Sequence, residues 1–271
     1  MNDKTLRSTP SLSDHTTNEI EVFPGVMERR YFLRSSVTTV AAVLALHMTG
    51  WNASAQEVSR ARIALGAEKL NWEDFLKESI PVAQQLVADS TFSIDEYLYR
   101  IGSLATRLEE IPDTQLFPYT AVDPRVFFAP SFRGSPFFII QWRMEAGAVL
   151  PPHNHPNASV CTLGYEGEVW LRNFEIVGEA PPYASKKTFR VRETHNELMT
   201  RGRINTLSSS RDNIHHFRVG RKGARGIDIT TLHGKPAPFS FLDISEEPAD
   251  AENRIFEATW NDLGRKSPVG F

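Results

Sequence analysis

Between residues 57 and 110, hydrophobic residues recur at the spacing of a helical face and predict two α-helices. The first lies within 57–90, and Asn71 is its expected N-cap because acidic residues follow in what would be the first turn. The second lies within 93–110, where Ser93 followed by Glu96 has the capping-box spacing. Neither segment carries a catalytic motif, so both helices are expected to act as packing layers.

From about Gln115 onward, short apolar runs alternate with Gly, Pro and Asn turns, which predicts β-strands. The predicted strands are 137–144, 160–163, 168–175, 204–207, 214–219, 226–231 and 239–244. In the first of them, Ile140, Trp142 and Met144 share one face, and Gln141 and Arg143 share the other. Many short strands at this spacing predict a mainly β sandwich or small barrel, preceded by the two helices.

The N-terminal region is expected to act as a targeting signal and not to form part of the folded domain. Residues 1–26 are polar and predicted to be disordered, and Glu28–Ser35 resembles a twin-arginine export signal. The apolar stretch 37–48 is too short to span a bilayer, and Ala53-Ser54-Ala55 fits a cleavage site before Gln56. The resemblance implies a bacterial protein that the twin-arginine machinery carries to the periplasm. The alternative is a chance arginine pair before an uncleaved anchor helix.

Length and composition restrict the possible domain organisation, binding partners and metal ligands. The 271 residues suffice for one sizeable domain with appendages, which we expect to divide into segments 1–55, 56–114 and 115–271. A net charge of -3 gives no electrostatic case for binding nucleic acid or an anionic membrane. The single cysteine, Cys161, excludes an internal disulfide and any cysteine-based zinc or iron–sulfur site. The eight histidines are therefore the main candidate metal ligands.

Two histidine segments form the most informative pattern. His153 and His155, in Pro152–Pro156, are separated by one residue, so on an extended segment both imidazoles project to the same side. A third imidazole from the distant segment Asn213-Ile214-His215 would complete a facial site that leaves coordination positions open. A His-x-His also occurs by chance, and the flanking prolines and the third histidine argue against chance here.

These segments resemble a known superfamily. Gly147, His153-Asn154-His155 and Gly167 match the first motif of the cupins, whose fold is a double-stranded β-helix or jelly roll. Val160 stands where most cupins have a glutamate ligand, and this loss is similar to the thiol dioxygenases of the cysteamine and plant cysteine oxidase branch. The Asn-Ile-His segment resembles the third-ligand motif of that branch. The match covers roughly residues 115–245.

The resemblance implies iron(II) held by three neutral histidines: His153, His155 and His215. It also implies a small thiol substrate and O2, with a sulfinic acid as product. Cysteamine, cysteine, a mercaptocarboxylate or an N-terminal cysteine all fit as the thiol. His216 is adjacent to His215, and strand alternation lets only one of the two face inward. Two other functions stay open: another metal-dependent cupin enzyme (a carbon-substrate dioxygenase, isomerase or lyase), and a non-catalytic periplasmic binding or sensing module.

Several other residues are weaker candidates. Thr231 and His233 resemble the Ser-x-His of a hydrogen-bonded triad in related dioxygenases, although Lys235 stands where the triad has tyrosine. We expect Thr231 to orient His233 near the metal, or His233 to be a satisfied barrel-end histidine. His195 reads as a loop residue, and alternation turns Cys161 away from the metal. Four arginines are candidate clamps for a substrate carboxylate, with the second expected to point outward: Arg125, Arg143, Arg172 and Arg203.

Overall fold

The computed structural model describes residues 68–183, 185–234 and 240–261. Its contacts divide the chain into the units Met1–Asn52 and Ala53–Phe271, and every described residue belongs to the second unit. The expected export signal and cleavage site, the start of the first predicted helix and Lys235 lie outside the described residues. The segment boundaries at 55 and 114 stay predictions. Within the described part, no helix has the length and apolar character needed to cross a membrane.

Both predicted helices are present, as α3 (Trp72–Ala88) and α4 (Ile94–Ala105). Their predicted N-caps are confirmed: Asn71 Oδ1 accepts the amide of Asp74 at 2.9 Å, and Ser93 Oγ accepts that of Glu96 at 3.1 Å. The second helix ends five residues before the predicted limit of 110. The reason is a backbone bridge between Leu108 and Leu70, which draws the chain out of the helix.

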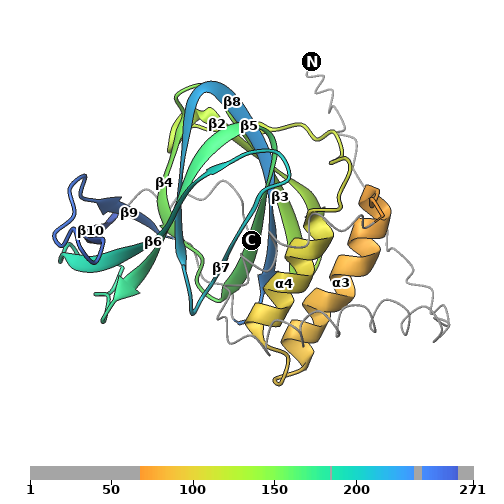
Figure 1. Cartoon of the computed structure of the whole chain (residues 1–271), viewed down its shortest axis with the longest axis horizontal. Helices are drawn as coiled ribbons and strands as arrows, with labels where there is room; N and C mark the ends of the chain where they lie inside the picture. The colour runs from red at the N-terminus through yellow and green to blue at the C-terminus, as the bar shows by residue number, and fades with distance from the viewer. Residues whose placement is uncertain (1–67, 184, 235–239, 262–271) are drawn as a thin grey trace, which may run out of the picture. The chain divides into compact units, whose positions relative to one another are not determined.

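Within the described residues, ten strands form one antiparallel barrel. They are β1 (Phe117–Tyr119), β2 (Asp123–Arg133), β3 (Phe137–Met144), β4 (Val149–Asn154), β5 (Ala158–Val177), β6 (Phe189–Met199), β7 (Ile204–Ser208), β8 (Ile214–Leu232), β9 (Phe241–Ile244) and β10 (Ile255–Asn261). The strand order is β1-β2-β3-β8-β4-β9-β10-β6-β5-β7, and the additional β5–β8 pairing closes the barrel. The predicted fold class, a mainly β double-stranded β-helix preceded by two helices, is confirmed (Figure 1).

The long strands β5 and β8 run antiparallel to each other and form the spine of the barrel. β8 pairs with β4 through its first half and with β3 through its second half. The bend between the halves depends on glycine: Gly167 has a φ of +68°, and a Cβ there would lie 1.9 Å from the carbonyl oxygen of Gly223. The predicted strands 160–163 and 168–175 are therefore one strand, as are 214–219 and 226–231.

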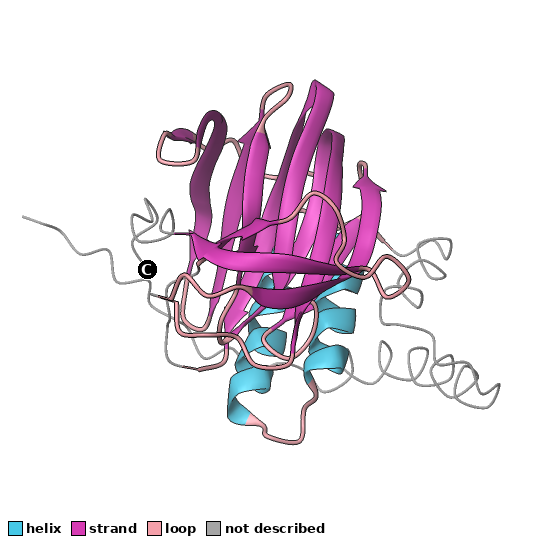
Figure 2. Ribbon diagram, turned by 90° about the vertical axis from the view of Figure 1, so that its left-hand side faces the viewer, coloured by secondary structure: helices cyan, strands magenta, loops and turns pink. Residues whose placement is uncertain are grey.

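Hydrophobic side chains pack on both sides of the barrel wall. Trp142 and Met144 of β3 lie in the inner cluster with Phe217, as the predicted alternation requires. Phe137 and Ile139 point to the opposite side, into a cluster that they share with α3 and α4. Figures 1 and 2 show these two helices side by side against the strands. The helices thus cover one outer face and leave the barrel interior to the strands.

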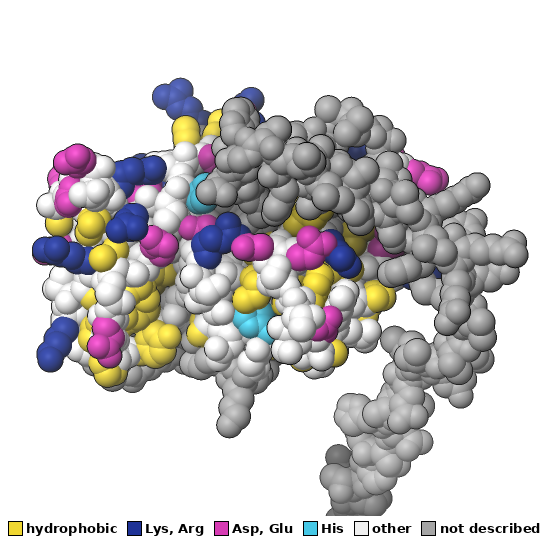
Figure 3. All heavy atoms as spheres, turned by 60° about the horizontal axis from the view of Figure 1, so that its bottom comes forward, with side chains coloured by type: hydrophobic (Ala, Val, Ile, Leu, Met, Phe, Trp, Pro, Cys, Tyr) yellow, Lys and Arg dark blue, Asp and Glu magenta, His cyan; other side chains and the backbone are white. Residues whose placement is uncertain are grey.

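Five strands were not predicted from the sequence: β1, β2, β4, β6 and β10. β6 is the clearest case, because its residues alternate between buried Phe189, Val191 and Glu193 and exposed charged neighbours. Its composition resembled a loop, and His195 was wrongly placed in one. Basic and acidic side chains are interspersed over the face drawn in Figure 3, as the small net charge leads one to expect.

Candidate metal centre

Three histidine side chains meet inside the barrel, two from strands and one from the residue that follows β4. His153 on β4 is the register partner of His215 on β8, and their Nε2 atoms lie 2.9 Å apart. His155 follows the last residue of β4, and its Nε2 lies 3.0 Å from that of His215. The structure therefore brings together all three residues that the sequence singled out as metal ligands.

Burial keeps these imidazoles neutral. His215 is fully buried and His153 is 5% exposed. Desolvation lowers the pKa of His153 to about 4 and holds the pKa values of His155 and His215 well below the usual histidine value. Near pH 7 each ring then presents a lone pair on one nitrogen, which is the form in which histidine binds a metal.

The distances among the three nitrogens suit a metal ion. Nitrogens bound at ~2.1 Å with angles near 90° at the metal are roughly 3.0 Å apart. His153 Nδ1 lies 2.9 Å from the carbonyl oxygen of Pro151, to which it donates when Nε2 keeps its lone pair. His215 Nε2 approaches two other Nε2 atoms, and one proton cannot satisfy both contacts. The buried trio could therefore hold a metal ion.

His216 points to the other side of the sheet. It is the register partner of Arg172, whose guanidinium lies over the rings of Phe174 and Phe256 in a separate buried cluster. His216 also helps to line a shallow outer cavity of about 690 Å³ together with Arg218. None of the three histidines of the trio lines this cavity, which lies on the outer side of β8. The inward position thus belongs to His215, as the Asn-Ile-His segment indicated.

A carboxylate ligand is absent from the trio. Val160, at the position where the resemblance places a glutamate in most cupins, is fully buried. Its neighbours Cys161 and Leu163 belong to the helix-facing cluster, so Val160 faces the barrel interior and Cys161 faces away, as predicted. Within 68–183, 185–234 and 240–261, the trio is the only group of three or more potential ligands found close enough to hold a metal.

A reciprocal hydrogen-bond pair fixes the two ligand segments to each other. The amide of His155 donates to the carbonyl of Asn213 at 3.1 Å, and Asn213 Nδ2 donates back to the carbonyl of His155 at 3.0 Å. The same Nδ2 also donates to the carbonyl of Ser208 at 3.1 Å. This explains the asparagine of the Asn-Ile-His segment: its side chain holds one ligand segment in place against the other.

The expected hydrogen bond between Thr231 and His233 is not formed. The Thr231 hydroxyl accepts a 2.6 Å bond from Tyr97 on α4, and both residues are fully buried. The His233 ring instead contacts Ser159 Oγ at 3.0 Å. Thr231 and Ser159 are register partners, and alternation from Ile229 and Cys161 places both on the helix-facing side of the sheet. The predicted position of Thr231 and His233 beside the metal is therefore wrong.

None of the four candidate arginines points into the barrel. Arg172 pairs with Glu193 at 2.5 Å on the outer face, and the exposed Arg143 lies over the ring of Phe127. Arg125 and Arg203 are exposed. The prediction that Arg143 points outward is confirmed. The described barrel interior therefore offers no guanidinium from this set to a substrate carboxylate.

A buried carboxyl group, Asp228, was missed. Its neighbours Ile227 and Ile229 belong to the helix-facing cluster, so Asp228 faces the barrel interior. Thr162 Oγ1 donates to its Oδ1 at 2.6 Å, and desolvation raises the pKa of Asp228 to about 6. The available signal was alternation itself, since an acidic residue between two isoleucines on a strand must face the opposite side.

No protein family model and no curated protein matches the chain. Solved structures with a similar fold include the cupin domain of Cnp3 from Schizosaccharomyces pombe, which is 14% identical, with 45% of this chain and 72% of that one covered at a TM-score of 0.32. The polyketide cyclase RemF from Streptomyces resistomycificus is 14% identical, with 51% and 86% covered at 0.35. A conserved protein with a double-stranded β-helix domain from Klebsiella pneumoniae is 11% identical, with 48% and 97% covered at 0.33. Similarities at this level do not indicate an activity. The fold is identified from the strand order of this chain.

Proposed function

We propose that this protein is an iron(II)-dependent thiol dioxygenase that converts a small thiol and O2 to a sulfinic acid. The observation that carries the proposal is the trio of neutral histidines, with Nε2 separations of 2.9 and 3.0 Å and no carboxylate among them. Three uncharged ligands leave the full charge of a divalent ion for an anionic thiolate. When bound, the iron would supply the redox chemistry and open coordination positions.

The choice of iron rests on the resemblance of the two histidine segments to thiol dioxygenases. Imidazole ligands suit zinc, copper, iron and nickel, so the ligand set restricts the metal without selecting one. The reaction consumes one O2 for each thiol, breaks the O–O bond and places both oxygen atoms on sulfur. The chain's own residues position the reactants: Asn213 holds the ligand segments together, and the hydrophobic inner cluster limits the access of water.

We infer that the substrate is a thiol that carries an ammonium group. Asp228 offers a buried carboxylate with one oxygen accepting from Thr162, and its raised pKa of about 6 leaves it mostly ionised at pH 7. The four candidate arginines lie outside the barrel. Among the thiols left open by the sequence, cysteamine and an N-terminal cysteine fit this charge pattern better than a mercaptocarboxylate.

The site of action is also part of the proposal. The segment Glu28–Ser35 resembles a twin-arginine signal, and we propose export of the folded protein to the periplasm by that machinery. Insertion of the metal before export would fit this route. Fractionation of cells that express the chain with Arg29 and Arg30 intact or changed to lysine tests the assignment, because the lysine variant should remain in the cytoplasm.

The central experiment is anaerobic loading with iron(II), followed by a panel of thiols and a measured amount of O2. The proposal expects sulfinate by mass spectrometry with one O2 consumed per thiol, and faster turnover of cysteamine than of mercaptopropionate. Oxygen uptake with a carbon substrate and none with thiols would favour another metal-dependent cupin enzyme. Stable metal binding without any turnover would favour a binding or sensing module.

A further inference from the structure

A row of polar residues crosses four neighbouring strands at the level of the histidine trio. The register pairs His153 with His215, His215 with Asn173, and Asn173 with His195 on β6. Directly paired residues on antiparallel strands face the same side, so His195 faces the same side as His215. Two strand spacings of ~4.8 Å place the two backbones roughly 10 Å apart.

Unsatisfied polar atoms gather along this row. Asn173 is fully buried and donates Nδ2 to Asn205 Oδ1 at 3.0 Å. Among the described residues, Asn173 Oδ1, Asn205 Nδ2 and the Nδ1 atoms of His195 and His215 are buried without a hydrogen-bond partner. An unmet hydrogen bond on a buried group costs about 1–3 kcal/mol, so several in one place indicate bound water or ligand.

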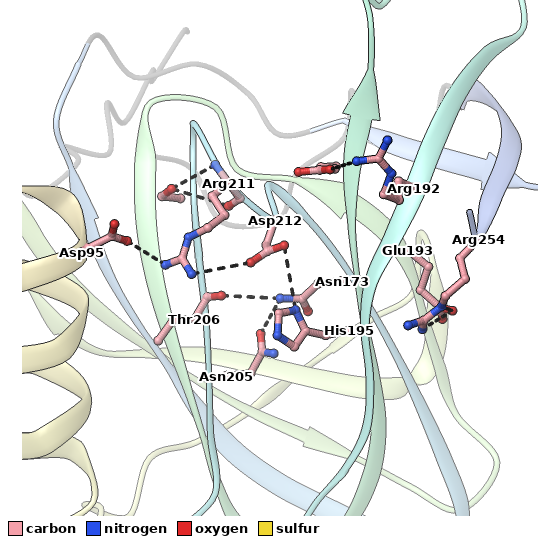
Figure 4. Close-up of polar contacts among 12 residues, drawn as sticks. Asp95, Asn173, Arg192, Glu193, His195, Asn205, Thr206, Arg211, Asp212 and Arg254 are labelled. Atoms are coloured by element: carbon pink, nitrogen blue, oxygen red, sulfur yellow. Dashed lines mark hydrogen bonds and ion pairs between the residues drawn. The ribbon is translucent and has the colours of Figure 1, made fainter. Parts of the chain in front are cut away.

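A buried carboxylate faces His195 at the end of the row. Asp212 Oδ1 lies 3.9 Å from His195 Nδ1, and Asp212 is 3% exposed (Figure 4). Its backbone is left-handed, with a φ of 54°, in the loop that precedes His215. Arg211 holds this loop to α4 through a 3.0 Å ion pair with Asp95. A carboxylate on this side favours a proton on Nδ1, which leaves the lone pair on Nε2.

We propose that His195, oriented by Asp212, accepts the proton that the thiol loses on binding at the trio and passes it to solvent. This inference rests on the proposed thiol substrate. The S–H bond breaks, its electron pair stays on sulfur, and the proton moves through water beside Asn173 Oδ1 to His195 Nε2, with no change of oxidation state. The His195 side chain is 29% exposed, so the imidazolium can release the proton to bulk water.

The first test uses the full chain without metal. Nitrogen-15 NMR of the neutral His195 ring should show the Nδ1–H tautomer. In Asp212→Ala the ring should revert to the Nε2–H tautomer, which free histidine favours. An identical tautomer in both proteins would overturn the orienting role of Asp212, whatever the activity of the loaded enzyme.

The second test is chemical rescue in the iron-loaded enzyme. His195→Ala should lower kcat roughly 100-fold, as removal of an acid–base group typically does, and added imidazole should restore much of the loss. Wild type with the same imidazole corrects for inhibition. His233→Ala is the matched control, because its ring bonds Ser159 on the helix-facing side, and it should keep its rate.

The outcomes separate this inference from the proposed function. Wild type that forms sulfinate, with a His195→Ala variant that is equally fast or is not rescued, overturns the relay and leaves the dioxygenase standing. Wild type that forms no sulfinate from any thiol overturns both. Reduced iron content in His195→Ala, measured by metal analysis, would show a structural role in its place.

Discussion

His153 and His215 are direct register partners on β4 and β8, and their Nε2 atoms lie 2.9 Å apart. The pairing of these two strands therefore sets the geometry of the site. Backbone hydrogen bonds fix the two strands, the strands fix the rings, and burial removes the protons that would compete with a metal.

The orientation of β8 predicts different consequences for two adjacent histidines. His215→Ala should abolish iron retention because one of three ligands is lost, whereas His216→Ala should keep most of it because that ring faces the outer side. Metal analysis after gel filtration measures both variants. Retention in His215→Ala together with loss in His216→Ala would reverse the ligand assignment.

The buried Asp228 should cost stability at neutral pH. Its folded pKa of about 6 exceeds the unfolded value of 3.8, so the native state binds more protons between these values and stability falls as pH rises through that window. Asp228→Asn removes the charge and should raise the unfolding free energy at pH 7 by up to about 3 kcal/mol, with little gain at pH 3.5. Urea titrations at the two pH values measure the difference.

The same substitution should weaken the use of amino thiols. A lost charge-assisted hydrogen bond of about 1.5–3 kcal/mol predicts roughly a 10-fold or larger rise in KM for cysteamine. The KM for a neutral thiol such as mercaptoethanol should change much less. An equal rise for both thiols would show that Asp228 shapes the pocket without recognising an ammonium group.

Removal of the Asn213 side chain should loosen the metal centre without unfolding the barrel. Asn213→Ala loses the bonds to the carbonyls of His155 and Ser208, and iron affinity should fall about 10- to 100-fold. Competition with a chelator of known affinity provides the measurement. Asn196→Ala is the matched control, because that residue is exposed on β6. Equal affinities in the two variants would contradict the positioning role of Asn213.

Thr231 should contribute to stability through Tyr97 and leave the metal unaffected. Tyr97→Phe removes a buried 2.6 Å hydrogen bond and should cost about 1 kcal/mol, with wild-type iron content. The double variant Tyr97→Phe with Thr231→Val should recover part of the loss, because no hydroxyl is then left unpaired. Additive losses in this cycle would mean that the two hydroxyls do not interact.

Local patterns predicted much of this molecule, because the relevant physics is local. The caps at Asn71 and Ser93 depend on neighbouring residues, and the facing of Trp142 depends on simple alternation. The histidine trio could be predicted because the His-x-His spacing and the Asn-Ile-His motif can be recognised in the sequence without knowledge of the fold. Charged β6 was missed since only its paired strands reveal that one of its faces is buried.

The placement of Thr231 failed for a physical reason that the sequence does not display. His215, Phe217 and Val219 face inward, and strict alternation would turn Thr231 inward as well. At the bend, however, β8 advances five residues from Val219 to Ala224 while β5 moves two, from Val169 to Gly167. On β8 the inward-facing residues are therefore at odd positions before the bend and at even positions after it. Asp228 becomes an interior residue and Thr231 a helix-facing one.

The central claim is that three neutral histidines hold an iron whose open positions accept a thiolate. X-ray absorption of the anaerobic iron(II) protein, with and without cysteamine, tests it most directly. The account predicts nitrogen or oxygen scatterers alone in the first spectrum and a new sulfur scatterer at about 2.3 Å in the second. Spectra that stay identical when the thiol is added would contradict it.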